Sequence, residues 1–205
     1  MKKSLLLMAM ISPSVFAGGC PTLQNSLIIS EYIEGGSFNK AIEIFNGTGA
    51  TVDFDISTVE IILYSNGSPT ASSTYTFSGS TLADGGIFVL AHGSSNAGIL
   101  AIANDTSSGT ANWNGDDAIE LRVNGVVVDS IGQVGFDPGS FWGTGSVTTQ
   151  NDTLTRMGSI CGGDTDSSNA YDTTEWNGLA QDDISDLGSN GTGLLPVELM
   201  NFSVE

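Results

Sequence analysis

Short runs of β-branched and aromatic residues, separated by glycine-rich polar turns, recur along most of the chain. Several runs alternate apolar and polar positions with a period of two, as half-buried strands do. In one of them Ile42 and Ile44 should point one way, while Glu43 and Phe45 point the other. The pattern predicts an all-β domain whose strands are residues 27–33, 41–45, 59–64, 73–77, 87–91, 118–123 and 126–131.

Turn signals separate these runs at regular intervals. Asn124-Gly125 stands between two β-runs, and Asn-Gly in that setting is the strongest short signal for a hairpin. Short strands with regularly spaced turns are typical of a β-sandwich. The one helical candidate is the apolar stretch 97–103. The remaining turn signals are Asn46-Gly47, Asn66-Gly67, Asp84-Gly85-Gly86 and Asp137-Pro138-Gly139.

From residue 130 onward the alternation weakens. Aromatic side chains stand there among Gly, Asp and Thr, so we expect an ordered loop that they pin against the sandwich. Residues 182–193 are polar and predict a linker, and residues 194–204 return to a β-like pattern. The aromatic residues of the loop are Phe136, Phe141, Trp142 and Trp176.

The N-terminus has the plan of a secretory signal peptide. Lys2 and Lys3 precede an apolar stretch that is too short to span a membrane, and small residues near Ala17 offer a cleavage position. We expect residues 1–17 to be removed, which predicts a secreted, periplasmic or extracellular bacterial protein without a transmembrane segment. The alternative is a lipid anchor on Cys20, although the usual large aliphatic residue three places earlier is missing.

The charge balance is strongly acidic, with 23 Asp and Glu against 5 Lys and Arg and a formal net charge of −18. Such a surface repels phosphate backbones, which disfavours direct binding of nucleic acid unless cations bridge the two. It suits a divalent-metal binder or a salty exterior, and it also serves plain solubility.

Two cysteines, Cys20 and Cys161, remain after removal of the signal peptide. In an oxidising compartment an isolated pair most simply forms a disulfide, which predicts a bridge between the N-terminus and a late loop. Two free thiols are the alternative.

Few residues could carry catalysis. His92 is the only histidine and follows a predicted strand, where a lone histidine is more often a hydrogen-bonded structural residue. Serine-nucleophile, phosphate-loop and zinc-type spacings are missing. Glu31 and Glu43 could approach each other on adjacent strands, but paired surface acids alone do not make a hydrolase. We therefore expect no enzyme activity.

One loop has the spacing of an EF-hand calcium site. Oxygen-bearing side chains stand at its positions 1, 3, 5, 9 and 12, and Ala170 would offer its carbonyl at position 7. Asn169 replaces the usual glycine, and no helices are expected on either side. A polar loop held by its own hydrogen bonds is the alternative to Ca²⁺ binding. The predicted ligands are Asp164, Asp166, Ser168, Asp172 and Glu175.

Several separated motifs occur in a familiar order: residues 27–49, 113–121, 128–139 and 161–164, followed by Glu175-Trp176. Together they resemble the lamin tail domain as it occurs in bacterial extracellular nucleases. The resemblance covers residues 20–190 and implies an immunoglobulin-like β-sandwich with a long ordered loop region. In those nucleases the domain precedes a separate catalytic domain and is thought to be an accessory or targeting module.

These observations give one expected function and one alternative. We expect an exported, non-catalytic accessory or binding module at the bacterial cell exterior, with or without Ca²⁺, which binds an exterior ligand or protein. Its domain should span residues 20–190, and residues 191–205 should form a C-terminal linker or edge segment similar to the connector before sorting segments of exported proteins. The alternative is a fragment or partner of an extracellular endonuclease.

Overall fold

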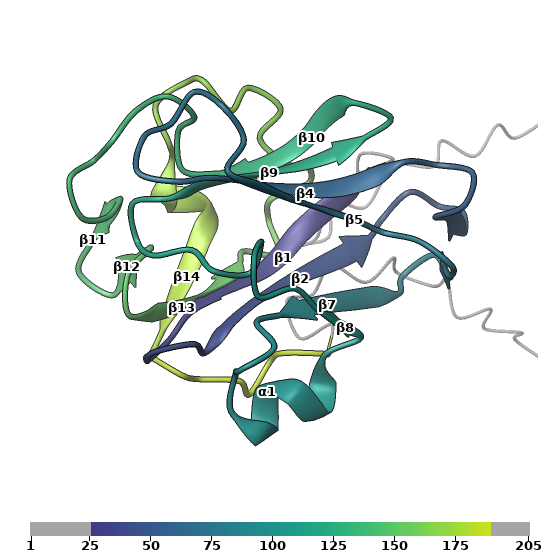
Figure 1. Cartoon of the computed structure of the whole chain (residues 1–205), viewed down its shortest axis with the longest axis horizontal. Helices are drawn as coiled ribbons and strands as arrows, with labels where there is room; N and C mark the ends of the chain where they lie inside the picture. The colour runs from purple at the N-terminus through teal and green to yellow at the C-terminus, as the bar shows by residue number, and fades with distance from the viewer. Residues whose placement is uncertain (1–25, 190–205) are drawn as a thin grey trace, which may run out of the picture.

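The computed structural model describes residues 26–189, which form two β-sheets packed face to face (Figure 1). The first sheet has the order β14-β13-β1-β2-β7-β8 and the second the order β10-β9-β4-β5. The strands of the first sheet are β1 (Leu27–Glu34), β2 (Lys40–Asn46), β7 (Ile87–Ala91), β8 (Asp105–Thr106), β13 (Asp152–Arg156) and β14 (Trp176–Leu179). Those of the second are β4 (Val59–Tyr64), β5 (Ser73–Thr76), β9 (Ala118–Val123) and β10 (Val126–Ile131).

Two small ribbons and two short helices complete the described part of the chain. β3 (Val52–Asp53) pairs with β6 (Thr81–Leu82), and β11 (Gly143–Thr144) pairs with β12 (Val147–Thr148). The helices are α1 (Ala97–Ile102) and the 3₁₀ turn η1 (Thr173–Glu175). Neither is long and apolar enough to cross a membrane.

The predicted β-sandwich is confirmed. Each predicted run forms a strand, and β4, β7, β9 and β10 match their predicted limits residue for residue. The hairpin between β9 and β10 turns at Asn124 and Gly125 with φ angles of 51° and 79°. These positive values are those of the turn that Asn-Gly favours between strands.

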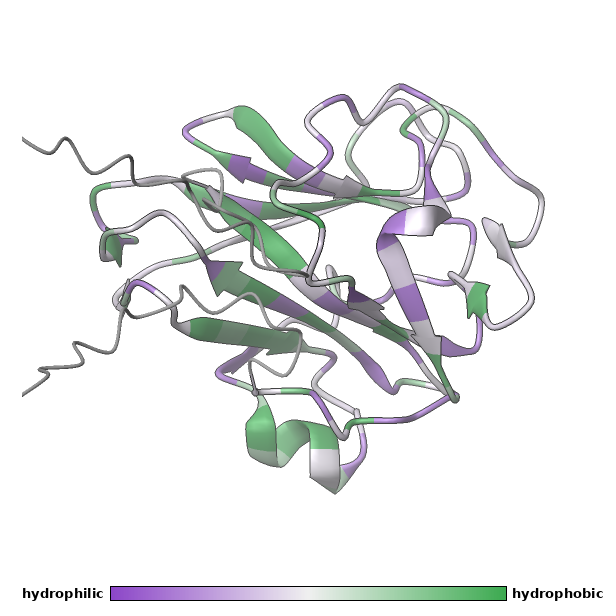
Figure 2. Ribbon diagram, turned by 180° about the vertical axis from the view of Figure 1, so that it is seen from behind, coloured by the Kyte–Doolittle hydropathy of each residue, from purple (hydrophilic) through white to green (hydrophobic). Residues whose placement is uncertain are grey.

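The main core lies between the two sheets. Ile42 and Ile44 of β2 face Ile61 of β4 and Leu121 of β9 there, as the alternation in β2 predicted. Burying a large aliphatic side chain stabilises a fold by about 1.5–3 kcal/mol, so this layer holds the sheets together. Figure 2 shows the apolar residues concentrated along the central strands.

The outer face of the first sheet is also covered, which the sequence did not predict. α1 and the last described residues lie across it (Figure 1), so that Ile99 and Leu187 pack on Val89 of β7. The prediction of a linker from residue 182 is wrong for its described part. Leu187 is buried, and the Asp182 carboxylate accepts a hydrogen bond from the backbone amide of Gly36. A single leucine among polar residues anchors this segment, which composition alone does not reveal.

The long loop region follows β10, as predicted, but only its tryptophans act as anchors. Trp142 and Trp176 are buried, whereas Phe136 and Phe141 are 50% and 41% exposed. The signal peptide (residues 1–17), Cys20 and residues 191–205 lie outside the described residues. The domain limits of 20 and 190 therefore stay predictions.

Candidate functional site

The sandwich has an open end with a cavity of about 420 Å³ between its sheets. Four pieces of chain meet there: the start of β1, the loop from β2 to β3, the turn after β3, and the ends of β9 and β10 that adjoin their hairpin. The lining includes Leu27, Val52, Asp53, Ile56, Val123 and Val128.

The floor of this cavity is apolar and belongs to the core. Leu27 is buried, and Val123 and Val128 pack on the core cluster while keeping part of their surface in the cavity. Such a concave apolar surface, open to solvent at the edge of a rigid sandwich, is the usual form of a ligand site.

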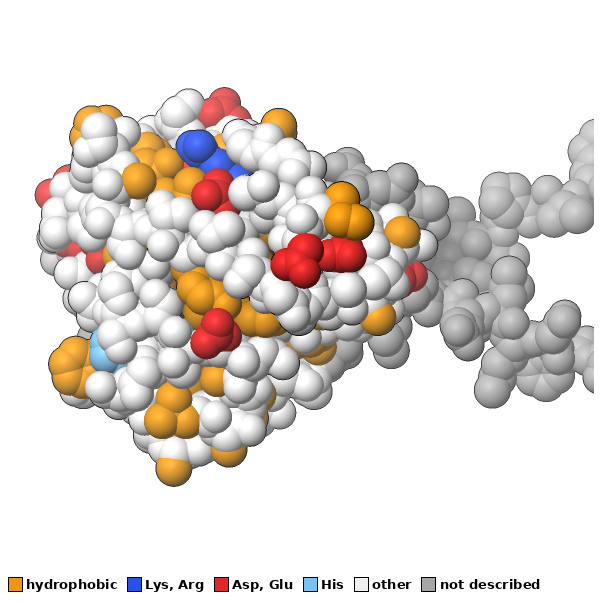
Figure 3. All heavy atoms as spheres, turned by 45° about the vertical axis from the view of Figure 1, so that its right-hand side comes forward, with side chains coloured by type: hydrophobic (Ala, Val, Ile, Leu, Met, Phe, Trp, Pro, Cys, Tyr) orange, Lys and Arg blue, Asp and Glu red, His pale blue; other side chains and the backbone are white. Residues whose placement is uncertain are grey.

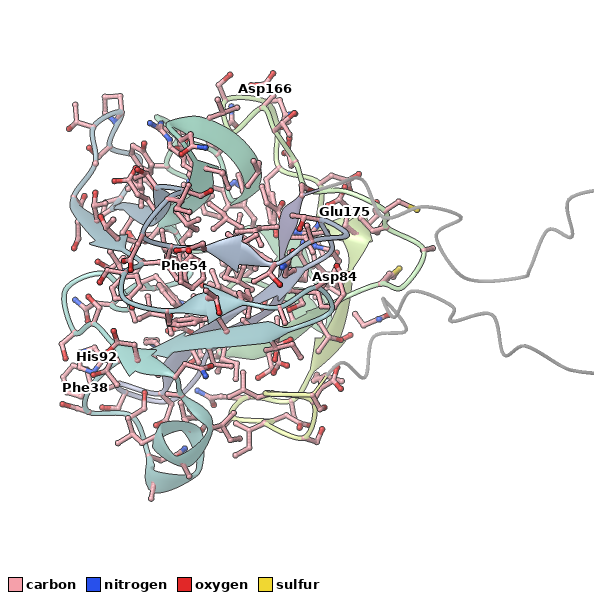
Figure 4. The ribbon with its side chains drawn as sticks, turned by 90° about the vertical axis from the view of Figure 1, so that its right-hand side faces the viewer. Phe38, Phe54, Asp84, His92, Asp166 and Glu175 are labelled. Atoms are coloured by element: carbon pink, nitrogen blue, oxygen red, sulfur yellow. The ribbon has the colours of Figure 1, made fainter. Side chains whose placement is uncertain are left out.

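Ile56 stands at the rim and is 82% exposed, the largest exposed fraction among the large apolar side chains of residues 26–189. A hydrogen-bonded turn presents it. The Asp53 carbonyl accepts the amides of Ile56 and Ser57 at 3.2 and 2.8 Å, and the neighbouring Phe54 inserts between the sheets against Phe77 (Figure 4). Because the turn is fixed at both ends, Ile56 is held outward by the fold.

Three acids lie at this opening or in the loops beside it. Asp53 lines it, and Asp55 and Asp84 hold its loops by accepting the backbone amides of Gly79 and Gly49 at 2.9 Å each. The lining contains no Lys or Arg. Figure 3 shows acidic side chains beside apolar ones on this side of the molecule. The site therefore has an apolar floor and an acidic rim.

Glu31 and Glu43 lie directly opposite each other on β1 and β2, so the expectation that they approach is confirmed. A β-bulge between Ile29 and Glu31 creates this register, because the extra residue, Ser30, moves Glu31 opposite Glu43. The expectation that they are surface acids is wrong. Their exposed fractions are 1% and 2%, since the covered outer face of the sheet encloses them.

The two glutamates differ in their partners. Glu43 accepts hydrogen bonds from the Ser30 hydroxyl and the Gly188 amide, each at 2.7 Å. Both carboxylate oxygens of Glu31 are buried without a hydrogen-bond partner. Burial, together with the charge of Glu43, raises the pKa of Glu31 to about 9. Burial also raises the pKa of Glu43 to about 7, against the opposing effect of its two donors.

A second buried carboxylate, Asp129 of β10, belongs to an ion-pair network. Arg156 of β13 donates to Asp129 at 2.7 Å and to Glu175 at 2.7 Å, and its guanidinium lies 4.2 Å from the centre of the Trp176 ring. Asp129 and Arg156 are both 0% exposed. This network joins both sheets and the late loop, and the sequence pattern gave no sign of it.

The five predicted calcium ligands do not converge on one position. Each has another hydrogen-bond or ion-pair partner. Glu175 pairs with Arg156, and Asp172 accepts the backbone amide and hydroxyl of Thr174. Asp166 accepts both from Ser168, while Asp164 accepts the amide of Asp166. These hydrogen bonds lower the pKa of Asp166 and of Asp172.

Within residues 26–189 no three acids, histidines or cysteines are grouped so that they could hold a metal ion. The geometry favours the alternative of a loop held by its own hydrogen bonds. Calcium binding, which the spacing predicts, would require these partners to be displaced, and it stays untested.

His92 is a hydrogen-bonded residue at the end of β7, in the environment that the sequence suggested. Its Nδ1 accepts the amide of Ser94 at 2.9 Å, and its ring stacks on Phe38 with centroids 4.6 Å apart (Figure 4). Burial and the nearby Lys40 charge lower its pKa. The predicted bridge between Cys20 and Cys161 stays a prediction, because Cys20 lies outside the described residues.

Sequence reasoning missed the cavity. The one local signal was Ile56, an isolated large apolar residue inside the polar turn Asp53–Ser57. The other lining residues come from strands distant in sequence, so only the fold brings them together.

Comparison with known protein families identifies the type of domain. The family model of the lamin tail domain matches residues 21–135. These residues include β1 to β10, and hence the cavity from Leu27 to Val128 and both buried glutamates. No curated protein matches the chain.

Proposed function

Because the chain belongs to the lamin tail domain family, an immunoglobulin-like and non-catalytic family, we propose that it is a binding module whose contact surface is the cavity at the open end of the sandwich. The observation that carries this proposal is Ile56, a large apolar side chain held outward beside an apolar cavity. Exposed apolar surface rimmed by polar groups is the usual mark of an interaction site.

The chemistry of the site indicates its partner. An aliphatic or aromatic side chain would fill the apolar floor formed by Val52, Val123 and Val128. The acidic rim and the net charge of −18 favour positive charge beside that side chain. The partner that fits is a protein segment in which an apolar residue is flanked by Lys or Arg.

The setting that we propose is the bacterial cell exterior. The basic start and apolar stretch before Ala17 support export. The resemblance to the lamin tail domains of extracellular nucleases supports an accessory role beside such an enzyme. Nucleic acid itself is a poor partner, because an acidic surface repels phosphates.

A peptide-display library selected on the immobilised protein tests the contact surface. Enriched peptides should carry an apolar residue next to Lys or Arg. Ile56→Asp should weaken their binding by at least about tenfold, the effect of losing about 1.4 kcal/mol. Leu100→Asp is the matched control, because Leu100 is a partly exposed apolar residue of α1 outside the cavity.

Peptides that bind Ile56→Asp as well as the natural protein would refute this surface. The accessory role has a separate test, in which the protein is incubated with DNA and Mg²⁺ or Ca²⁺. We expect the DNA to stay intact, since no oriented base or metal site has been identified in residues 26–189. Cleavage that is lost in Glu31→Gln would instead make the chain a nuclease.

A further inference from the structure

The pair of Glu31 and Glu43 has no part in the proposed binding surface. It lies on the outer face of the first sheet, whereas the cavity opens between the sheets. Across that face the register forms a row of four residues, Thr155 of β13, Glu31, Glu43 and Val89 of β7. Two acids at the centre of an otherwise uncharged row need neutralising in some way.

The charged groups around the pair are acids. The segment that covers the face contributes Asp183 and Asp186, and both add to the negative field at Glu31. β7 and α1 contain no charged residue, with the sequences IFVLA and AGILAI. The covering segment therefore adds negative charge to the face that it covers.

Within residues 26–189 no Lys or Arg is available to pair with Glu31. The three Lys and Arg residues of the described part each form an ion pair with another acid. Lys40 pairs with Glu34 at the end of β1, Arg122 with Glu120, and Arg156 with Asp129 and Glu175. The other two, Lys2 and Lys3, lie in the expected signal peptide. A metal ion is not favoured either, because no three acids are grouped closely enough to hold one in residues 26–189.

A proton is the remaining way to neutralise the site. We propose that Glu31 holds a proton in the folded domain at neutral pH, and that its loss in alkaline solution loosens residues 183–189 from the sheet. Glu43 stays the hydrogen-bond acceptor that holds Gly188, while Glu31 is the group whose ionisation repels residues 183–189.

The two glutamates divide these roles because their donors differ. Ser30 and Gly188 donate to Glu43 and so favour its ionised form, whereas nothing donates to Glu31. If Glu31 ionises, two facing carboxylates meet under a segment that itself contains Asp183 and Asp186. The cover is then repelled by the face on which Leu187 packs.

The sign of the pH dependence follows from proton linkage. The pKa of Glu31 is about 9 in the folded protein, against an ordinary value of 4.5. Between these values the folded state holds a proton that the unfolded state has lost. Stability should therefore fall as pH rises through this window and level off above it. One proton changes the unfolding equilibrium constant about tenfold per pH unit.

The first experiment is urea unfolding of the natural chain and of Glu31→Gln between pH 5.5 and 9.5. The natural chain should lose stability more steeply, with a slope larger by up to one proton, or about tenfold per pH unit. Glu60→Gln, a glutamate of β4 in the other sheet, is the matched control and should keep the steep slope. Glu31→Met gives the same comparison if the buried amide prevents folding.

Hydrogen exchange tests whether residues 183–189 loosen from the sheet. After correction for base catalysis, residues 183–189 of the natural chain should lose at least about tenfold of their protection between pH 6 and pH 9. In Glu31→Gln the protection of the same segment should not change over this pH range.

Equal slopes in the natural chain and Glu31→Gln, or unchanged protection of residues 183–189, would overturn the proposal. So would a slope that Ca²⁺ or Mg²⁺ at about 10⁻³ M abolishes in the natural chain alone. That result would make the pair a cation site.

Discussion

Two buried carboxylates, Asp129 and Glu31, show opposite ways of placing an acid inside this sandwich. Their exposed fractions are 0% and 1%. Asp129 accepts hydrogen bonds from the backbone amides of Ile29, Ser130 and Asp164, and it pairs with Arg156. Glu31 accepts none. Both side chains are buried, so the difference lies in their partners and in the charges near them.

The comparison separates a carboxylate whose charge is stabilised by partners, Asp129, from one whose protonation changes with pH, Glu31. Burial raises the pKa of Asp129, but Arg156 and three amides oppose that rise. At Glu31 nothing opposes it, and the neighbouring acids increase it. Removing the partner of Asp129 should therefore damage the fold, whereas at Glu31 it is ionisation in alkaline solution that should destabilise it.

The largest effect that we predict is the loss of Arg156. Arg156→Met keeps much of the side-chain volume but leaves Asp129 buried without its ion-pair partner and frees Glu175. Breaking a buried pair from one side costs about 3–5 kcal/mol. The free energy of unfolding, measured with urea at neutral pH, should fall by that amount.

Arg122→Met is the matched control. Arg122 pairs with Glu120 at 2.6 Å, but the Arg122 side chain is 31% exposed. The buried Glu120 also keeps hydrogen bonds from the Tyr64 and Ser167 hydroxyls, so loss of Arg122 should cost less than loss of Arg156. Equal losses in the two variants would contradict the structural role of the pair between Arg156 and Asp129.

The second effect concerns the loop that supplies one donor to Asp129. Asp164 donates its amide at 2.9 Å, and Cys161 lies three residues earlier. A bridge from Cys161 to Cys20 would restrain this loop, and disulfides typically stabilise folds by about 2–4 kcal/mol. Reduction should lower the free energy of unfolding accordingly. Mass spectrometry of the unreduced protein should find the two cysteines in one linked peptide pair.

Two free thiols in protein exported to an oxidising compartment would contradict this prediction, and so would a lipid on Cys20. In either case the N-terminus would not restrain the Asp129 loop, and reduction should leave stability unchanged.

The sequence predicted the strands but not the environment of the two acids. The period-two pattern located β2 and the direction of Glu43, because alternation reports which face a side chain points to. It could not report that the outer face is covered, since the cover consists of a mostly polar segment with one buried leucine, Leu187. The bulge at Ser30, which brings Glu31 opposite Glu43, has no signature in the pattern either.

The ion-pair network of Asp129 could not be predicted from the sequence for a related reason. Arg156 meets partners 27 and 19 residues away along the chain, on a different sheet and in a loop. Spacing can suggest ligands within one loop, as it did for residues 164–175. It cannot show that Glu175 is already bound by an arginine from β13.

The smallest effect that we predict is the response of the loop from Asp164 to Glu175 to calcium. Asp166 and Asp172 accept hydrogen bonds from their own turns, and Glu175 accepts one from Arg156 at 2.7 Å. A Ca²⁺ ion would have to displace that arginine and so disturb the pairing of Asp129. We therefore expect melting in about 10⁻³ M Ca²⁺, the range of weak extracellular sites, to match melting in NaCl of equal ionic strength. A calcium-specific rise that disappears in Asp164→Asn/Glu175→Gln would show instead that the loop rearranges into a metal site. A rise that persists in that double variant would place the ion elsewhere on the acidic surface and leave the contrast between Asp129 and Glu31 intact.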